Sequence, residues 1–326
     1  WRDNADGWWS SSNNINSFKM TTGLQNYVVE ETSDDWVLYH NNFSICSRKV
    51  RLCLEEIGLD YRSEHIDLIE TGKYEVASKR FLKINPGATV PVLLHKGRPI
   101  YESHEQIYYL VEHTDNKNIL PSSENDKENM DYWVEKSSLI GNPLKNQDKY
   151  AGNSVAPLTF PLFVAMMRYV PFKEIFIGLR THPMKERVIG FFAFKTFGMK
   201  IFSSLFPFSK LLKSSFFNLN QHLYDLEKHL EGKKSLWIVG EEFTLADISW
   251  AVILHRFHEC GWGNLLLADK PFIKKYYFNL LNRESFKVAI DNASHPILTK
   301  GIDDLHKTFS TQSSLKEIYT QLEKSK

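Results

Sequence analysis

Two predicted helix starts carry the residues with the clearest chemical potential. Ser44 and Cys46 lie where a polar turn leads from a short strand into a helix, and Glu102 and Ser103 open a later helix. Free backbone N–H groups and the helix dipole favour negative charge there, so they lower the pKa of a thiol and attract a carboxylate. Cys46 is therefore a candidate for thiol exchange, which requires a thiolate. The ordinary alternatives are that Cys46 packs as a small residue and that Glu102 and Ser103 only cap their helix.

The other potential ligand residues indicate neither a metal site nor a disulfide framework. The chain has three cysteines, Cys46, Cys53 and Cys260, without a CxxC pair or zinc-type spacing. Cys53 and Cys260 are expected to pack in the interior. His255 and His258 lie three residues apart, but no third ligand is specified. We expect no metal, and a reducing compartment, which favours a cytoplasmic protein.

Short strands and helices alternate from residue 35 onward and must position these groups. Apolar patterns and turns predict strand, helix, strand, helix, hairpin and helix within about 80 residues, with Val90–Pro91 leading into the hairpin. This order is typical of a mixed sheet with helices packed against it. The predicted strands are 36–39, 61–68, 92–95 and 99–101, and the predicted helices end at about residues 58, 84 and 112.

The second half of the chain is predicted to be helical. Residues 114–127 are polar and are predicted as a linker, and residues 128–310 as an all-helical domain. Thr244 and Asp247 have the spacing of a capping box at the start of an apolar helix. The remaining predictions are helices at 129–139 and 219–230, an N-terminal extension at 1–34 that packs on a neighbour or is partly mobile, and a C-terminal tail at 311–326.

An aromatic and basic segment interrupts the helical half. Residues 155–217 hold 13 of the 22 phenylalanines, with nine lysines or arginines and two glutamates, for a local charge of +7. Such a composition suits an interfacial helix on anionic lipid, or a groove for an apolar partner or ligand. The alternative is an enlarged helical core whose lysines face water. Both interpretations stay open at the level of sequence.

Overall composition excludes several classes of protein. With 42% apolar residues and a formal charge of +1, the chain is neither disordered nor a general binder of polyanions, so no nucleic-acid partner is expected. No fully apolar run reaches 20 residues, because the longest charge-free run, 150–167, contains Pro157 and Pro161. A membrane-spanning helix is therefore not expected.

Several ordered motifs resemble the glutathione transferase superfamily. The first is Leu38–Arg51, which includes Ser44-Ile45-Cys46-Ser47, and the others are Asn85–Leu93, Tyr101–Leu110, Phe243–Asp247 and Asn282–Phe286. The Ser-Ile-Cys-Ser string closely resembles the tetrachlorohydroquinone reductive dehalogenases within that superfamily. The resemblance covers about residues 35–293 and is interrupted by the Phe-rich segment. It implies a thioredoxin-like α/β domain at 35–113, followed by the all-helical domain that supplies most of the second-substrate pocket.

The resemblance also implies roles for particular residues, with glutathione as co-substrate. Ser44 matches the catalytic serine of theta- and zeta-like classes, whose hydroxyl donates to the glutathione sulfur and favours the thiolate. Cys46 matches the dehalogenase cysteine, which resolves a glutathione conjugate through a mixed disulfide. Val90 and Pro91 match the cis-proline turn that pairs with the cysteinyl part of glutathione. Glu102 and Ser103 match the pair that holds its γ-glutamyl end.

Three functions follow from this resemblance. The first is conjugation of glutathione thiolate to an apolar electrophile, and a close variant is reductive dehalogenation or ether cleavage that uses Cys46. The third is a weakly catalytic or non-catalytic membrane-surface protein, similar to the ganglioside-induced differentiation-associated branch, in which residues 155–217 contact lipid. A homodimer is the habit of the superfamily.

Overall fold

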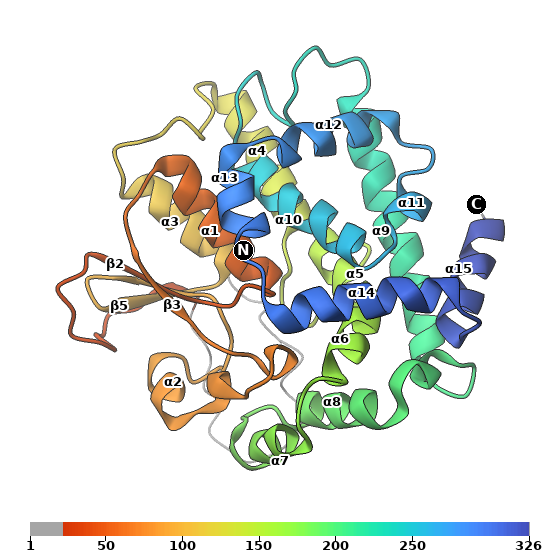
Figure 1. The fold of residues 1–326 in the computed structure, drawn as a ribbon. Coiled ribbons are helices and arrows are strands. Elements are labelled where there is room, and N and C mark those ends of the chain that lie inside the picture. The colour runs from red at the N-terminus through yellow and green to blue at the C-terminus, as the bar shows by residue number, and fades with distance from the viewer. Residues whose placement is uncertain (1–21, 326) are drawn as a thin grey trace.

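Five short strands form one mixed sheet at one side of the molecule (Figure 1). The computed structural model describes residues 22–325. The strands lie in the order β1-β5-β4-β2-β3; β2 and β3 are parallel and the other pairs are antiparallel. Their bounds are β1 Gly23–Leu24, β2 Trp36–His40, β3 Arg62–His65, β4 Val92–His95 and β5 Arg98–Tyr101.

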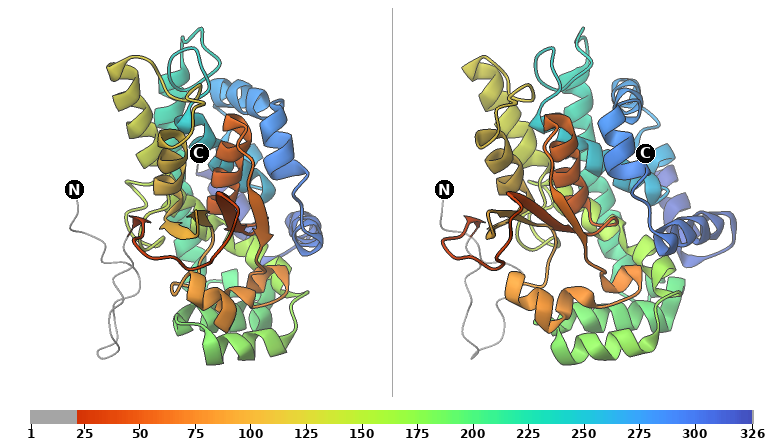
Figure 2. Two further views of the ribbon diagram at one scale, coloured as in Figure 1. Left: turned by 90° about the vertical axis from the view of Figure 1, so that its left-hand side faces the viewer. Right: turned by 60° about the vertical axis from the view of Figure 1, so that its left-hand side comes forward.

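Helices cover both faces of this sheet, as expected for a thioredoxin-like domain. Helices α1 (Ile45–Ile57) and α3 (Ser103–Glu112) lie side by side on one face, and α2 (Lys79–Ile84) lies on the other (Figures 1 and 2). Two single 3₁₀ turns, Ile69–Thr71 and Glu75–Ala77, precede α2. The stretch 74–84, predicted as a helix or a helical loop, is therefore a 3₁₀ turn followed by a short α-helix. The α1 helix ends at Gly58, whose φ of 68° places it in the left-handed region that favours glycine.

Strand β1 is a feature that the sequence analysis missed. It lies within residues 1–34, which were predicted as an extension, and it pairs with β5 through Gly23 opposite Tyr101 and Leu24 opposite Ile100. A two-residue strand carries no periodic pattern, so nothing in the sequence indicated it. Residues 1–21 of the predicted extension lie outside the described part of the chain.

The helical domain surrounds α10, which is buried along most of its length (Figure 1). The predicted capping box is present: the Asp247 carboxylate accepts hydrogen bonds from the backbone N–H of Thr244 at 2.8 Å and of Ile238 at 3.0 Å. Helix α4 starts inside the predicted linker, because Ser123 caps it by accepting from the N–H of Asp126 at 3.1 Å. The larger helices are α4 Glu124–Ser137, α5 Ala151–Leu158, α6 Phe160–Met167, α7 Phe172–Thr181, α8 Lys185–Phe197, α9 Phe208–Leu230, α10 Leu245–Glu259, α12 Pro271–Leu281, α14 Pro296–Ser310 and α15 Ser314–Lys324.

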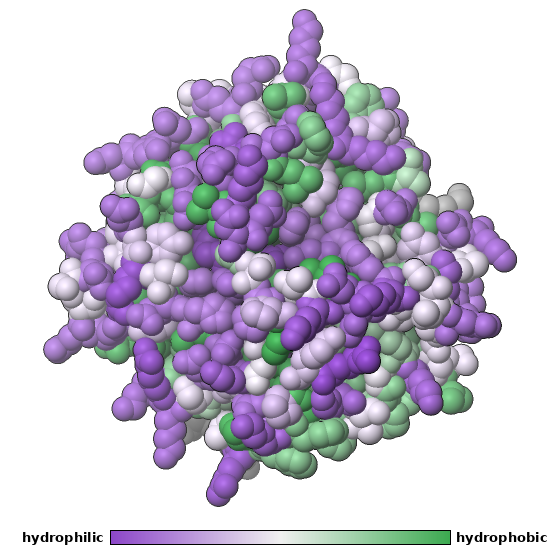
Figure 3. All heavy atoms as spheres, in the orientation of Figure 1, coloured by the Kyte–Doolittle hydropathy of each residue, from purple (hydrophilic) through white to green (hydrophobic). Residues whose placement is uncertain are grey.

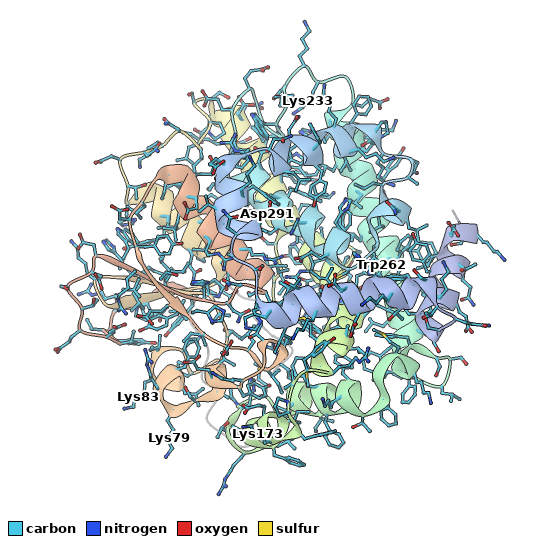
Figure 4. All side chains as sticks on the ribbon, viewed as in Figure 1. Lys79, Lys83, Lys173, Lys233, Trp262 and Asp291 are labelled. Atoms are coloured by element: carbon cyan, nitrogen blue, oxygen red, sulfur yellow. The ribbon has the colours of Figure 1, made fainter. Side chains whose placement is uncertain are left out.

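Short helical turns complete this domain, and the predicted tail is part of it. They are η3 Gly198–Phe202, α11 Gly263–Leu266, α13 Glu284–Phe286 and the π-helical turn η4 Lys287–Asp291. Helix α15 lies within the predicted tail and buries Leu315 and Leu322. Trp262, which is fully buried beside α14 (Figure 4), stacks on Tyr319 of α15 with ring centroids 6.0 Å apart.

The Phe-rich segment 155–217 is partly core and partly surface. Helices α5 and α6 pack against α9, α10 and α14, and they bury Val155, Leu158 and Leu162 completely. Helices α7 and α8 instead form the lower rim of the molecule, where hydrophobic patches appear among hydrophilic ones (Figures 1 and 3). Exposed apolar side chains on these two helices are Phe172, Phe176, Ile177, Ile189, Phe192 and Phe197.

Three basic residues of this rim, Lys173, Arg180 and Lys185, are exposed, whereas Arg187 is partly buried and pairs with Glu70. Lys173 of α7 points away from the body, as do Lys79 and Lys83 of the neighbouring α2 (Figure 4). None of the helices within residues 22–325 is both long and apolar enough to cross a membrane.

Candidate functional site

Ser44 caps α1 and keeps its own proton available. Its Oγ accepts a hydrogen bond from the backbone N–H of Ser47 at 3.2 Å. Among residues 22–325, no acceptor receives the hydroxyl proton of Ser44. A hydroxyl that accepts one hydrogen bond and has a free proton is suited to donate to a negatively charged atom above the helix start.

The turn before Ser44 is fixed by Asn41, a residue that the sequence analysis missed. Asn41 is fully buried; its Oδ1 accepts from the N–H of Phe43 at 2.9 Å, and its Nδ2 donates to the carbonyl of Ile66 at 2.9 Å. These bonds hold the turn to the segment after β3. An asparagine two residues before a turn amide is a recognisable Asx-turn signal.

Cys46 is the second residue of α1 and faces the start of α3. Its thiol contacts the Ser103 hydroxyl. Burial raises the pKa of the Cys46 thiol and the Glu102 carboxylate adds to that, while Lys49, Ser103 and Arg256 act in the opposite direction. The lowered pKa expected from the helix start was therefore wrong in direction, because loss of solvent outweighs the helix dipole.

The remaining cysteines pack in the interior, as predicted. Cys53 and Cys260 are both fully buried, and burial raises the pKa of each thiol.

The predicted cis-proline turn is present at the same end of the sheet. The Val90–Pro91 peptide bond is cis. Because Val92 lies opposite Tyr39 in the antiparallel pair, Val90 and Pro91 lie beside the turn that leads to Ser44. Among the described residues, the backbone N–H and C=O of Val90 have no hydrogen-bond partner. They can therefore pair with an extended peptide as an adjacent strand would.

Glu102 and Ser103 stand at the start of α3, next to this turn. The Gln106 side chain, one turn further along α3, donates to the Pro91 carbonyl at 3.1 Å and so ties α3 to the proline turn. Glu102 has a φ of 69°, a strained conformation for a residue with a side chain. Its carboxylate makes no hydrogen bond or ion pair within residues 22–325, and burial raises its pKa.

Lys49 completes this cluster and was also missed by the sequence analysis. It lies one turn after Cys46 and is only 3% exposed. Within the described chain its ammonium has no hydrogen bond or ion pair, and Cys46 and Glu102 act on its charge. Burial lowers the pKa of Lys49, and these two neighbours oppose the shift. A basic residue three positions after a helix-start cysteine was the available signal.

Arg48 of α1 makes an ion pair with the helical domain. It forms two hydrogen bonds with the Glu259 carboxylate of α10, at 2.7 and 2.9 Å. Arg51 donates to the carbonyl of Ala289 at 2.7 and 2.9 Å. It also donates to the Asn42 side-chain oxygen at 3.2 Å and to the Asn41 carbonyl at 3.4 Å, so its guanidinium is engaged by the turn before Ser44.

A surface hollow of about 390 Å³ lies elsewhere on α1. It is lined by His40, Arg51, Tyr61, His65 and Ala289, among others, and by none of the predicted site residues. Residues 22–325 contain no group of three or more histidine, cysteine, aspartate or glutamate side chains that could hold a metal ion.

The comparisons with known proteins agree with this arrangement. Residues 43–113 match the family described as Glutathione S-transferase, N-terminal domain, and residues 218–277 match Glutathione S-transferase, C-terminal domain. The two matches leave residues 114–217, which include most of the Phe-rich segment, between them.

Curated relatives span most of the chain. Glutathione S-transferase TCHQD of Arabidopsis thaliana is 25% identical over 259 residues, 78% of this chain and 88% of the relative. Tetrachloro-P-hydroquinone reductive dehalogenase of Sphingobium chlorophenolicum is 24% identical over 257 residues, 77% of this chain and 94% of the relative. These names are those of enzymes, so they do not favour the membrane-surface alternative.

Solved structures show the same fold. The crystal structure of beta-etherase LigF from Sphingobium sp. strain SYK-6 has a TM-score of 0.63 at 21% identity and covers 79% of this chain and 99% of its own. Ure2p in complex with glutathione has a TM-score of 0.56 at 15% identity and covers 80% of this chain and 96% of its own. The chain thus matches both glutathione S-transferase domain families in order, and its fold and relatives are those of a glutathione S-transferase-like enzyme.

Proposed function

We propose that the protein activates glutathione as a thiolate beside Ser44 and transfers it to an apolar electrophile. The observation that carries this proposal is the unshared hydroxyl proton of Ser44 at the N-terminus of α1. In the reaction the thiolate forms a carbon–sulfur bond and a halide or an alkoxide leaves with the bonding electrons. Ser44 stabilises the thiolate by hydrogen bonding and does not itself become covalently attached.

The surrounding groups match the parts of glutathione. The unpaired backbone of Val90 suits the cysteinyl peptide, and the zwitterionic γ-glutamyl end needs one anionic and one cationic partner. Glu102 and Lys49 supply these charges without pairing directly with each other in the structure. The Ser103 hydroxyl and the N-terminus of α3 favour the ligand's carboxylate. Glutathione is accordingly the co-substrate.

The names of the relatives point to two finer versions of this reaction. A relative is called a reductive dehalogenase and a structural neighbour a beta-etherase, which together suggest aryl halides or aryl ethers as substrates. In the reductive version, the Cys46 thiolate attacks the sulfur of a glutathione conjugate. A mixed disulfide between Cys46 and glutathione forms, and the aryl carbon leaves with the electron pair and takes up a proton. A second glutathione thiolate then attacks the glutathione sulfur of the mixed disulfide, which forms glutathione disulfide and releases Cys46 as a thiolate. The raised pKa of Cys46 favours simple conjugation as the leading version.

Two variants distinguish these versions. With an aryl halide, we expect Ser44→Ala to lower kcat/KM by about 100-fold, the cost typical of losing one donor to a developing anion. Cys46→Ser is expected to retain conjugation, and both proteins should still bind immobilised glutathione. Loss of turnover in Cys46→Ser with retention in Ser44→Ala would instead support thiol exchange. If the unmodified protein neither binds glutathione nor turns over an aryl halide, the proposed function is wrong.

A homodimer, the common state of the superfamily, is proposed on that analogy alone. Light scattering during size-exclusion chromatography would measure the molecular mass of the protein in solution and so distinguish a monomer from a dimer.

A further inference from the structure

The two carbonyl groups immediately before Ser44 are both held by arginines. Arg48 Nε donates to the Asn42 carbonyl at 2.9 Å. Arg256 of α10 donates to the Phe43 carbonyl, and its guanidinium lies 4.0 Å from the centre of the Phe43 ring. The backbone of the turn before Ser44 is thus held by one arginine from α1 and one from α10.

One carboxylate links the two arginines. Glu259 accepts two hydrogen bonds from Arg48 and lies 3.4 Å from Arg256 Nε. All three side chains are nearly excluded from water, with exposed fractions of 2%, 1% and 9% for Arg48, Arg256 and Glu259. Two guanidinium groups and one carboxylate leave this buried cluster with a net positive charge directly beneath the N-terminus of α1.

We propose that Arg256 is a positioning residue from the helical domain, whose buried charge favours a thiolate at the start of α1 and whose hydrogen bond fixes the Ser44 turn. The effect of Arg256 on the glutathione thiolate rests on the proposed function. For the protein's own Cys46 thiol it applies without any ligand.

Electrostatic effects on neighbouring groups support the inference. Burial alone would raise the pKa of Glu259, but the charges of Arg48 and Arg256 hold that pKa well below its usual range. Burial lowers the pKa of Arg256 to about 10, so it stays charged at neutral pH. The charged groups that act on the Cys46 thiol are Lys49 of α1, Glu102 before α3 and Arg256. Those that act on Arg256 itself are Glu259, Arg48, Cys260 and Glu70.

The molecule provides a matched control in a second interdomain ion pair on the same helix. Arg283, just before α13, donates two hydrogen bonds to the Glu56 carboxylate at the last turn of α1, at 2.7 and 2.6 Å. This pair joins α1 to the helical domain in the same way as Arg48 and Glu259. It contacts no carbonyl of the Ser44 turn.

The test measures how fast iodoacetamide alkylates Cys46 in the full-length, ligand-free protein as a function of pH. Cys46 is partly exposed, whereas Cys53 and Cys260 are fully buried, so the modified cysteine can be identified by peptide mass. We expect Arg256→Met to raise the apparent thiol pKa by about one unit, which lowers the neutral-pH alkylation rate several-fold. Glu259→Gln removes the negative charge and should lower that pKa instead. Arg256→Lys should lie close to the unmodified protein, and Arg283→Met should not shift the thiol pKa.

Opposite shifts for Arg256→Met and Glu259→Gln would support the inference. Unchanged thiol pKa values, or shifts in the same direction, would overturn it. If Arg256→Met does not fold, the sign of the Glu259→Gln shift decides the question. Glutathione binding by titration calorimetry is measured in parallel on the unmodified protein, so a failure of the proposed function would appear there without affecting the alkylation result.

Discussion

Gly178 of α7 lies directly against the aromatic ring of Tyr74, which follows the first 3₁₀ turn of the sheet domain. A Cβ atom at position 178 would lie 2.2 Å from Tyr74 Cε2. Nearby, Glu174 accepts a hydrogen bond from the Tyr74 N–H at 3.1 Å, and Arg187 pairs with the buried Glu70 at 3.1 Å. The rim formed by α7 and α8 is therefore docked on the thioredoxin-like domain.

Gly178→Ala should weaken this docking, because the added methyl group forces Tyr74 or α7 to move. We expect a loss of about 1 to 3 kcal/mol in the free energy of unfolding, measured by urea denaturation, and faster proteolysis within residues 172–197. The control is Gly190→Ala on α8, where an added Cβ meets no atom within 4 Å. Alanine there should be neutral or stabilising. Equal stability of the two variants would contradict a tight contact at Gly178.

Lys49→Met should separate binding from stability. The variant no longer buries an ammonium that lacks a partner among the described residues, so its free energy of unfolding should stay the same or rise. Glutathione affinity should fall about ten- to hundredfold, the range for a lost hydrogen bond to a charged group. Titration calorimetry measures the affinity, and Lys83→Met on the exposed side of α2 serves as control. Normal affinity combined with a large loss of stability would make Lys49 a structural residue.

Asp247→Asn should destabilise the helical domain in a pH-dependent way. The carboxylate accepts hydrogen bonds from Ile238 and Thr244 and from the Tyr276 hydroxyl at 2.9 Å, and an amide cannot accept all of them. We expect a loss of about 2 to 3 kcal/mol.

The sign of the pH dependence follows from the raised pKa of Asp247. Burial raises it from 3.8 to about 6, so the folded state holds this proton more tightly than the unfolded state does. The contribution of Asp247 is fully present below about pH 4 and declines as the pH rises to about 6. Urea denaturation of the unmodified protein and Asp247→Asn across this range checks it. An advantage of the unmodified protein that grows with pH would contradict the raised pKa.

Phe163→Ala should affect the second substrate more than glutathione. Phe163 of α6 is partly buried and meets Phe43, the residue before Ser44, edge to face at 5.3 Å. We expect KM for an apolar aryl halide to rise several-fold while KM for glutathione stays unchanged. Phe194→Ala is the matched control, since Phe194 belongs to the same aromatic cluster through Phe160 and Phe191 but is buried. It should lower stability by about 3 kcal/mol or more without changing either KM. If both variants had the same kinetic effects, Phe163 would not be a contact of the second substrate.

Local signals made the thioredoxin-like half largely predictable. Strand Val92–His95 and helix Ser103–Glu112 were predicted with the observed bounds, because turns, a proline and a helix start delimit them in the sequence. The capping box of Thr244 and Asp247 is equally local. Strand β1 was missed because two residues define no pattern.

The charged groups around the site could not be predicted in the same way. The partner of Arg48 lies 211 residues away at Glu259, and no pattern within one helix specifies such a distance. The predicted direction of the Cys46 pKa shift was wrong, because the shift is governed by burial. Burial depends on how α1 and α3 pack together, and the sequence of α1 alone does not specify that packing. The Phe-rich segment was ambiguous for the same reason: its composition suits both a core and a surface, and the structure uses α5 and α6 for one and α7 and α8 for the other.

The pairing of β1 with β5 has a practical consequence for anyone who shortens the protein. A version beginning at residue 35, where the family-like pattern starts, would lack Gly23 and Leu24, as well as Gln25 and Val29, which donate to the carbonyls of Pro99 and Gly97. The backbone N–H and C=O groups on the outer edge of β5 would then be unpaired and could bind a strand of another molecule. Unpaired strand edges promote aggregation. The truncated protein should therefore aggregate at concentrations where protein that retains residues 22–34 stays in solution.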